Sequence, residues 1–208
     1  MSDFRLYLDF TKIAEGGLSS AKTDTASSYP WPYPPYYHTN KGITRATFER
    51  YASILGYEPT YQNFVAMPQW IFEGIFYGFW KEAGAHLVRS QAIAQLIFQS
   101  KWGGGYSSLI KDIQRYLVDK GYTAVIVDGE LGPKTAAAIN ATSKTKAGET
   151  ALYKYTHEER LKYLRSLASY ADNGKGWESR MQKLYTFSMS LITNPKVIGA
   201  GFFLLWQF

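Results

Sequence analysis

The chain has 208 residues, 46% of them hydrophobic and 19% charged, which suits one or two globular domains and excludes a wholly disordered protein. It contains no cysteine, so disulfides, thiolate metal sites and a cysteine nucleophile are excluded. The formal net charge of +6 favours an anionic polymer as partner: nucleic acid, an anionic membrane or bacterial cell wall.

The first half of the chain predicts four helices. The first starts at Phe4 and ends at the Gly-Gly pair at 16–17, which is a good helix stop. Thr44 is a suitable N-cap for the second, and Pro68 opens a third that reaches Trp80. Ser90 caps a fourth, which ends at the glycines of residues 103–105.

Between the first two helices lies an insert of about residues 27–38 that is rich in tyrosine and proline. Its prolines exclude a helix, so we expect an extended, polyproline-like loop on the surface. The aromatic residues of this insert are Tyr29, Trp31, Tyr33, Tyr36 and Tyr37.

The second half predicts helices over residues 107–120, from Pro133 onward, over 156–170 and over 177–191. Residues 123–127 are β-branched and short, which favours one strand. The fold class is therefore mainly α. The triple glycine divides the chain into domains 1–104 and 105–191, followed by an apolar C-terminal segment, 192–208.

Several chemistries are not expected from this sequence. It has no phosphate-binding glycine loop and no nucleophile-elbow serine, and its three histidines lie far apart, so we expect neither a metal nor a cofactor. The lysines are spread rather than striped, which disfavours nucleic acid as a partner. The apolar C-terminal segment is too short to span a bilayer. Its residues from Phe202 to Trp206 are open to three interpretations: a packed helix, a peripheral membrane contact or a protein docking patch.

Two carboxylates are candidates for acid–base chemistry. Glu15 ends the first helix, where the negative end of the helix dipole favours a raised pKa, as a general acid at neutral pH requires. Asp24 follows in a polar loop and should stay ionised. Two carboxylates in unlike surroundings are the usual apparatus of glycosidic bond cleavage. Spacing alone leaves the alternative of a solvated surface glutamate and a turn-forming aspartate.

Residues 13–17 read IAEGG and residues 39–47 read TNKGITRAT. In this order they resemble the signature of glycoside hydrolase family 108, the phage- and prophage-type N-acetylmuramidases that are also called secretion activator proteins. Residues 113–117, 127–135 and 174–180, together with Arg160, resemble the family's C-terminal peptidoglycan-binding-like domain.

The resemblance implies a lysozyme-like helical lobe followed by a small helical peptidoglycan-binding-like lobe. It also implies a bacteriolytic enzyme that hydrolyses the β-1,4 bond between N-acetylmuramic acid and N-acetylglucosamine. Glu15 matches the family's catalytic glutamate, its general acid, and Asp24 falls at the family's usual distance after it. Thr39 matches the threonine before Gly-Ile-Thr, which by analogy with phage lysozymes positions a water or the sugar.

The insert is the main departure from the family, because it replaces the Asp-Pro-Gly-Gly stretch between Asp24 and Thr39. Whether Asp24 keeps its place therefore stays open. The aromatic rings of the insert either stack on sugar faces or pack the loop against its own lobe. The alternatives to a muramidase are an inactive wall-binding or phage-structural protein and a lytic transglycosylase. The N-terminal residues lack an apolar signal core, so we expect synthesis in the bacterial cytoplasm and delivery to the wall by a holin, a secretion apparatus or a virion.

Overall fold

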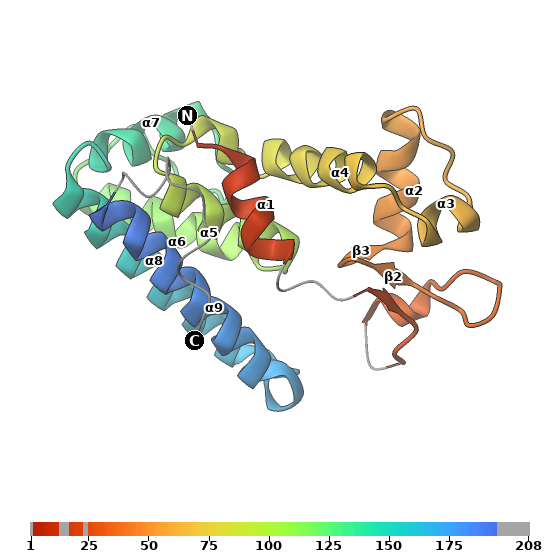
Figure 1. Ribbon diagram of the computed structural model, residues 1–208. Coiled ribbons are helices and arrows are strands. Elements are labelled where there is room, and N and C mark those ends of the chain that lie inside the picture. The colour runs from red at the N-terminus through yellow and green to blue at the C-terminus, as the bar shows by residue number, and fades with distance from the viewer. Residues whose placement is uncertain (1, 13–16, 23–24, 195–208) are drawn as a thin grey trace. The chain divides into compact units, whose positions relative to one another are not determined.

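The computed structural model describes residues 2–12, 17–22 and 25–194. In this part of the chain nine α-helices and three two-residue strands follow one another (Figure 1), so the predicted mainly α fold is confirmed. The helices are α1 (Phe4–Lys12), α2 (Arg45–Ile54), α3 (Tyr61–Val65), α4 (Gln69–Glu82), α5 (Gln91–Trp102), α6 (Tyr106–Asp119), α7 (Pro133–Thr142), α8 (Lys146–Ser166) and α9 (Tyr170–Thr193). The strands are β1 (Leu18–Ser19), β2 (Thr39–Asn40) and β3 (Ile43–Thr44), and the short 3-10 helices are η1 (Thr25–Ser28) and η2 (Ala85–Leu87).

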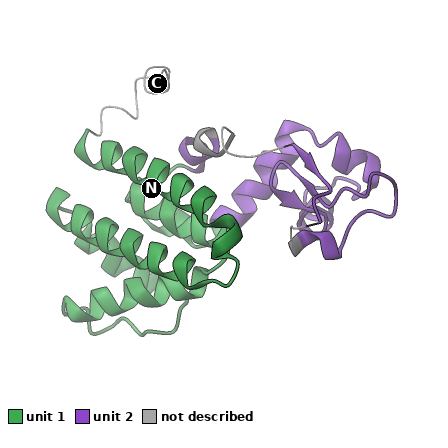
Figure 2. Cartoon of the chain, turned by 90° about the horizontal axis from the view of Figure 1, so that it is seen from below, with its two compact units in different colours: residues 1–3, 81–208 green, residues 4–80 purple. Residues whose placement is uncertain are grey.

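The chain forms two compact units, residues 4–80 and residues 1–3 with 81–208 (Figure 2). The sequence-based division at residues 103–105 differs from this one. The reason is the packing of α5, which contacts α6, α8 and α9. The helix before the triple glycine therefore belongs to the same compact unit as the helices after it.

Local start signals predicted several helices correctly. The Thr44 side chain accepts a hydrogen bond from the backbone N–H of Thr47 and caps α2. Ser90 caps α5 in the same way, through the N–H of Ile93. Pro133 stands at the first position of α7, where its missing N–H costs nothing.

The strand predicted over residues 123–127 is wrong. These residues form turns and irregular chain between α6 and α7, and the N–H of Val125 bonds to the carbonyl of Tyr122. Val125 is buried, whereas Ile126 and Val127 are exposed. β-branched composition favours a strand only where a partner strand is available, and no described residue pairs with this segment.

Two long helices begin earlier than their apolar pattern predicts, α8 at Lys146 and α9 at Tyr170. The N-terminal part of α9 contains Gly174 and Gly176, which disfavour a helix. The first turns of α9 nevertheless carry a contact to α8, because the Tyr170 hydroxyl donates to Glu178 at 2.7 Å, and Arg165 of α8 donates to the same carboxylate at 2.7 Å. Both bonds lower the pKa of the Glu178 carboxyl.

The core of the smaller unit is made by α2, α3 and α4. Phe48, Phe64 and Ile71 are fully buried there, and the rings of Phe48 and Phe64 meet edge to face at 5.3 Å. Gly78 of α4 lies against the ring of Tyr51 so closely that a Cβ would overlap it. The glycine therefore permits the close approach of α2 and α4.

The core of the larger unit is built around α5, which is buried from Gln91 to Ser100. Three glutamines of this helix are buried with their side chains bonded to different elements. Gln91 exchanges hydrogen bonds with the backbone of Asp3, Gln95 accepts from Ser188 of α9 at 3.4 Å, and Gln99 accepts from Arg160 of α8 at 3.2 Å. Among the described residues, no helix combines the length and the apolar character that a membrane span requires.

His157 of α8 makes the stability of the protein sensitive to acid. Its ring is buried, its Nε2–H donates to the Met181 carbonyl at 3.2 Å, and burial lowers its pKa below the ordinary value of 6.5. The unfolded chain therefore takes up a proton, as the pH falls through 6.5, that the folded chain does not. We expect the free energy of unfolding to fall between about pH 7.5 and about pH 5.5, and to fall less in His157→Gln. Denaturant unfolding of both proteins at the two pH values measures this, and equal losses would contradict it.

Candidate functional site

The TNKGIT segment forms a β-hairpin. Strands β2 and β3 pair antiparallel with Thr39 opposite Thr44. The two turn residues, Lys41 and Gly42, have φ angles of 50° and 76°. Positive φ at both positions is the geometry of a type I′ turn, which matches the twist of the strands it joins and favours glycine. The glycine of the motif is therefore required by the turn.

The hairpin is anchored to α3 and the residues after it. The buried Asn40 side chain donates to the carbonyl of Phe64 at 2.6 Å, and Lys41 Nζ donates to the carbonyl of Met67 at 3.1 Å. The other edge of β2 pairs with β1, where Thr39 lies opposite Ser19. These bonds fix Thr39 on the middle strand of a three-stranded sheet.

The hydroxyl of Thr39 is hydrogen-bonded to the ring of its neighbour His38. His38 Nε2 lies 3.1 Å from the carbonyl of Ala21, which can only accept, so Nε2 carries a proton. His38 Nδ1 and Thr39 Oγ1 share a hydrogen bond at 2.9 Å. The Thr39 hydroxyl is thus held by His38, and as a hydroxyl it keeps capacity for a further hydrogen bond to a water or a sugar hydroxyl.

The prediction that the insert is extended along its length is wrong. The insert folds back on itself. The N–H of Trp31 bonds to the carbonyl of Tyr37 at 2.9 Å, and the N–H of Tyr36 bonds to that of Tyr33 at 2.7 Å. The Trp31 ring is 6% exposed and packs on Tyr61 and Phe64, with ring centroids 5.9 and 5.7 Å away. Trp31 therefore belongs to the core of the smaller unit.

Arg45 at the start of α2 holds the first part of the insert. Its guanidinium lies 4.1 Å from the ring centroid of Tyr29 and 4.4 Å from that of Trp31. It also donates to the carbonyl of Pro30 at 2.6 Å and to Glu49 at 2.8 Å, and the Tyr29 hydroxyl donates to the same Glu49 carboxylate at 3.1 Å. Arg45 thus makes cation–π contacts with two rings and donates hydrogen bonds to a backbone carbonyl and a carboxylate.

The remaining rings of the insert lie at the surface. Tyr33 and Tyr36 are each 54% exposed, and Tyr29 is 47% exposed on its other side. The Tyr33 ring lies 5.3 Å from that of Tyr61, and Tyr37 is half-buried. The structure therefore divides the five aromatic residues into one that packs and four that present ring surface to solvent.

Glu15 and Asp24 lie outside the described residues, as do Phe202 and Trp206 of the C-terminal segment. In the sequence, Glu15 precedes β1 and Asp24 follows it. Among the described residues, no group of three or more histidines, aspartates and glutamates is arranged to hold a metal ion.

In the larger unit, a buried glutamine organises the loop between α6 and α7. Gln114 donates to the Asp128 carboxylate at 2.7 Å and accepts from the N–H of Gly129 at 2.8 Å. Asp128 also accepts from the N–H of Glu130 at 2.9 Å, and these bonds lower the pKa of its carboxyl. The Asp-Gly pair is thus a turn, as its residue types predict.

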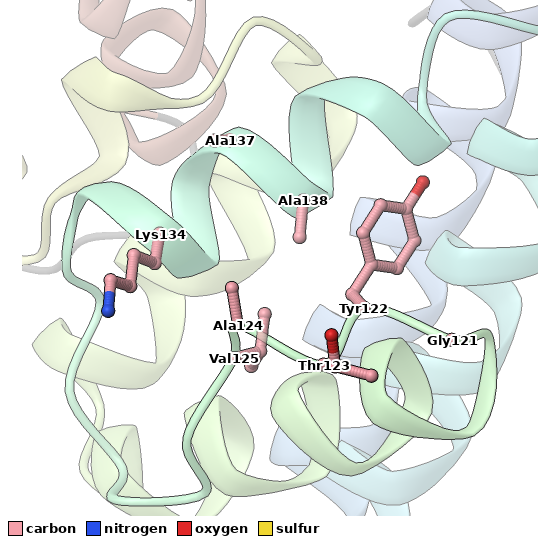
Figure 3. Close-up of a pocket in the computed structure, with 8 residues that line it drawn as sticks. All are labelled: Gly121, Tyr122, Thr123, Ala124, Val125, Lys134, Ala137 and Ala138. Carbon is pink, nitrogen blue, oxygen red and sulfur yellow. The ribbon is translucent and has the colours of Figure 1, made fainter.

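The same loop forms one side of a pocket of about 440 Å³, shown in Figure 3. Its other side is α7, which contributes the exposed Lys134 and Ala137 and the buried Ala138. The lining residues are Gly121, Tyr122, Thr123, Ala124, Val125, Lys134, Ala137 and Ala138. Sequence reasoning missed this pocket because it mistook residues 123–127 for a strand. The neighbouring pair of small residues at 137–138 was the available signal.

Residues 109–182 match the model of a family described as "Predicted Peptidoglycan domain". This match covers both the glutamine-held loop and the pocket beside it. It indicates a peptidoglycan-related protein and supports peptidoglycan as its partner.

Among solved structures, SagA of Brucella abortus has the same fold. The TM-score is 0.65 at 20% sequence identity, and the match covers 90% of this chain and 94% of that chain. No curated protein matches the sequence.

Replacing Arg45 with alanine should loosen the insert, because the rings of Tyr29 and Trp31 and the carboxylate of Glu49 lose their shared partner. We expect the free energy of unfolding to fall by roughly 1–3 kcal/mol, and proteolysis within residues 29–38 to become faster. Denaturant unfolding and limited proteolysis measure the two effects. Arg50→Ala is the matched control, since that arginine is on the same helix but lies over Tyr51. Equal effects of the two substitutions would show that Arg45 does not hold the insert.

Proposed function

We propose that the protein is a peptidoglycan hydrolase of the N-acetylmuramidase type. The observation that carries the choice of substrate is the match of residues 109–182 to the family described as "Predicted Peptidoglycan domain". The fold shared with SagA of Brucella abortus over most of both chains is compatible with this choice. The net charge of +6 favours adsorption to an anionic wall.

The proposed chemistry uses Glu15 as the general acid that protonates the leaving glycosidic oxygen. Asp24 stabilises the oxocarbenium-like transition state or activates the water. Thr39 forms a hydrogen bond to that water or to the sugar, through the capacity left by its bond to His38. The pairing of β1 with β2 supports this assignment, since the strand that carries Thr39 is bonded to the strand between Glu15 and Asp24 in the sequence.

In this proposal the exposed rings of the insert bind the glycan. Tyr29, Tyr33, Tyr36 and Tyr37 present flat surfaces on which the C–H faces of sugar rings stack. Trp31 holds the insert in place from the core rather than contacting the sugar. The proposal thus combines both interpretations of the insert, because packing and stacking are assigned to different members of the same segment.

Replacing Glu15 with glutamine should abolish cleavage, since an amide of nearly the same shape cannot supply the proton. Loss of a general acid lowers the rate by about 10²–10⁴-fold. Turbidity loss of purified peptidoglycan, followed by mass spectrometry of the released muropeptides, measures this for the full chain. Glu58→Gln is the matched control, because Glu58 is an exposed glutamate of the same unit.

The products separate the proposed function from its alternatives. Reducing muropeptides released by the wild type and by Glu58→Gln alone establish a muramidase that depends on Glu15. Products with 1,6-anhydro ends indicate a lytic transglycosylase instead. Binding of several wall types without release of any product would leave an inactive wall-binding or phage-structural protein.

Replacing Tyr33 or Tyr36 with alanine should weaken glycan binding without unfolding the protein, because both rings are more than half exposed. We expect KM to rise by about three- to tenfold with little change in the melting temperature. Trp31→Ala should have the opposite pattern and lower the free energy of unfolding by about 3 kcal/mol, since it empties a buried site. Steady-state kinetics on soluble glycan and thermal unfolding test both. Unchanged KM in Tyr33→Ala and Tyr36→Ala would rule out a glycan-binding insert.

A further inference from the structure

The loop of residues 121–125, which lines the pocket together with α7, is tied to both neighbouring helices. Its Tyr122 is held from two sides: the N–H bonds to the carbonyl of Leu117 at the end of α6, and the hydroxyl accepts from Thr142 at the end of α7, both at 3.1 Å. The N–H of Val125 bonds back to the carbonyl of Tyr122 at 3.1 Å. Because the loop is tied to both helices, a ligand does not have to order it, which lowers the cost of binding.

The lining of the pocket has a distinct chemical character. Its surface is largely apolar and small, since it is formed by Gly121, Ala124, Ala137 and Ala138 (Figure 3). Small side chains present a surface against which methyl-sized groups pack. A volume of about 440 Å³ falls within the range of small-molecule sites.

Two polar side chains of the lining are available to a ligand. The Lys134 side chain makes no hydrogen bond or ion pair with a described residue, and the same is true of the Thr123 side chain. Figure 3 shows Lys134 on α7 at one end of the pocket and Tyr122 at the other, with Thr123 beside Tyr122. A cation next to a small apolar surface is complementary to a molecule that carries both a carboxylate and several methyl groups.

We infer that this pocket binds the muramoyl-peptide portion of peptidoglycan, with a stem-peptide carboxylate on Lys134 and its methyl groups against Ala124, Ala137 and Ala138. The inference rests on the proposed function, because it takes peptidoglycan as the ligand. The lactyl, N-acetyl and alanyl groups of this unit each end in a methyl, and its peptide carries free carboxylates. N-acetylglucosamine has one such methyl and no carboxylate, so it fits the lining less well. The pocket therefore reads the peptide-bearing sugar and adds a second point of attachment to the wall.

Calorimetric titration of the full chain with N-acetylmuramoyl-L-alanyl-D-glutamate tests the inference. Lys134→Ala should weaken binding by about tenfold or more, because a charge-assisted hydrogen bond is lost. Ala137→Phe should block the pocket from an exposed position, so that the fold is preserved. The matched control is Lys154→Ala, which removes the same charge from an exposed site on α8. N,N′-diacetylchitobiose serves as the probe without a carboxylate, and circular dichroism checks the fold of each variant.

We expect the affinity for the dipeptide to fall in Lys134→Ala and Ala137→Phe and to stay unchanged in Lys154→Ala. In the wild type, the affinity for the dipeptide should exceed the affinity for chitobiose. Equal affinity in all four proteins, or no dipeptide binding to the wild type, would overturn the assignment of the pocket. Sedimentation with purified sacculi and muropeptide release are measured in parallel with the same proteins. If the wild type sediments with sacculi and cleaves them but the dipeptide does not bind in the expected pattern, the pocket assignment alone is wrong. If it neither sediments nor cleaves, the proposed function fails as well.

Discussion

The burial of α5 from Gln91 to Ser100 is the constraint on which the larger unit depends. An apolar helix in that position would pack in several ways, but its three buried glutamines restrict the choice. Leaving a buried amide group without a partner costs about 1–3 kcal/mol, so the hydrogen bonds of Gln91 and Gln99 tie this helix to defined places, whereas the Gln95 amide nitrogen is buried without a partner among the described residues. Gln99 is bonded to Arg160 of α8, whose guanidinium is almost fully buried and lies 5.2 Å from the ring of Tyr163. Apolar packing stabilises this unit, and the glutamines determine which element lies where.

Much of the helical fold could be predicted from local signals, and the errors have a common cause. Thr44, Ser90 and Pro133 act on their own helix starts, so a sequence of a few residues is enough to recognise them. The first turns of α9 are bonded through Glu178 to Arg165 of another helix, which no local pattern reveals. The wrong strand at 123–127 has the same origin. Its β-branched residues are held by the turn at Tyr122 and by burial of Val125 alone.

The candidate site was predictable in part. The hairpin residues stood out through their motif, although strands of two residues are too short to show any periodicity. The insert was recognised as irregular from its prolines, but composition cannot say which of its rings face inward. Trp31 faces inward because its ring packs on Tyr61 and Phe64, which lie beyond the insert in the sequence. The role of Gln114 was hidden for a similar reason, since its partners Asp128 and Gly129 belong to the next loop.

The two units carry different halves of the proposed activity, and this has a physical consequence. Cleavage is assigned to residues of the smaller unit, whereas the peptide-reading pocket lies in the larger one. A weak contact at the pocket is sufficient, because two sites on one chain raise the effective concentration of each at a polymeric ligand. Peptidoglycan also repeats its peptide-bearing sugar along every glycan chain. A pocket that releases one of these sugars can therefore bind the next one along the same chain. On this proposal, modest affinity at Lys134 would thus keep the protein on the wall while leaving it free to move to the next bond.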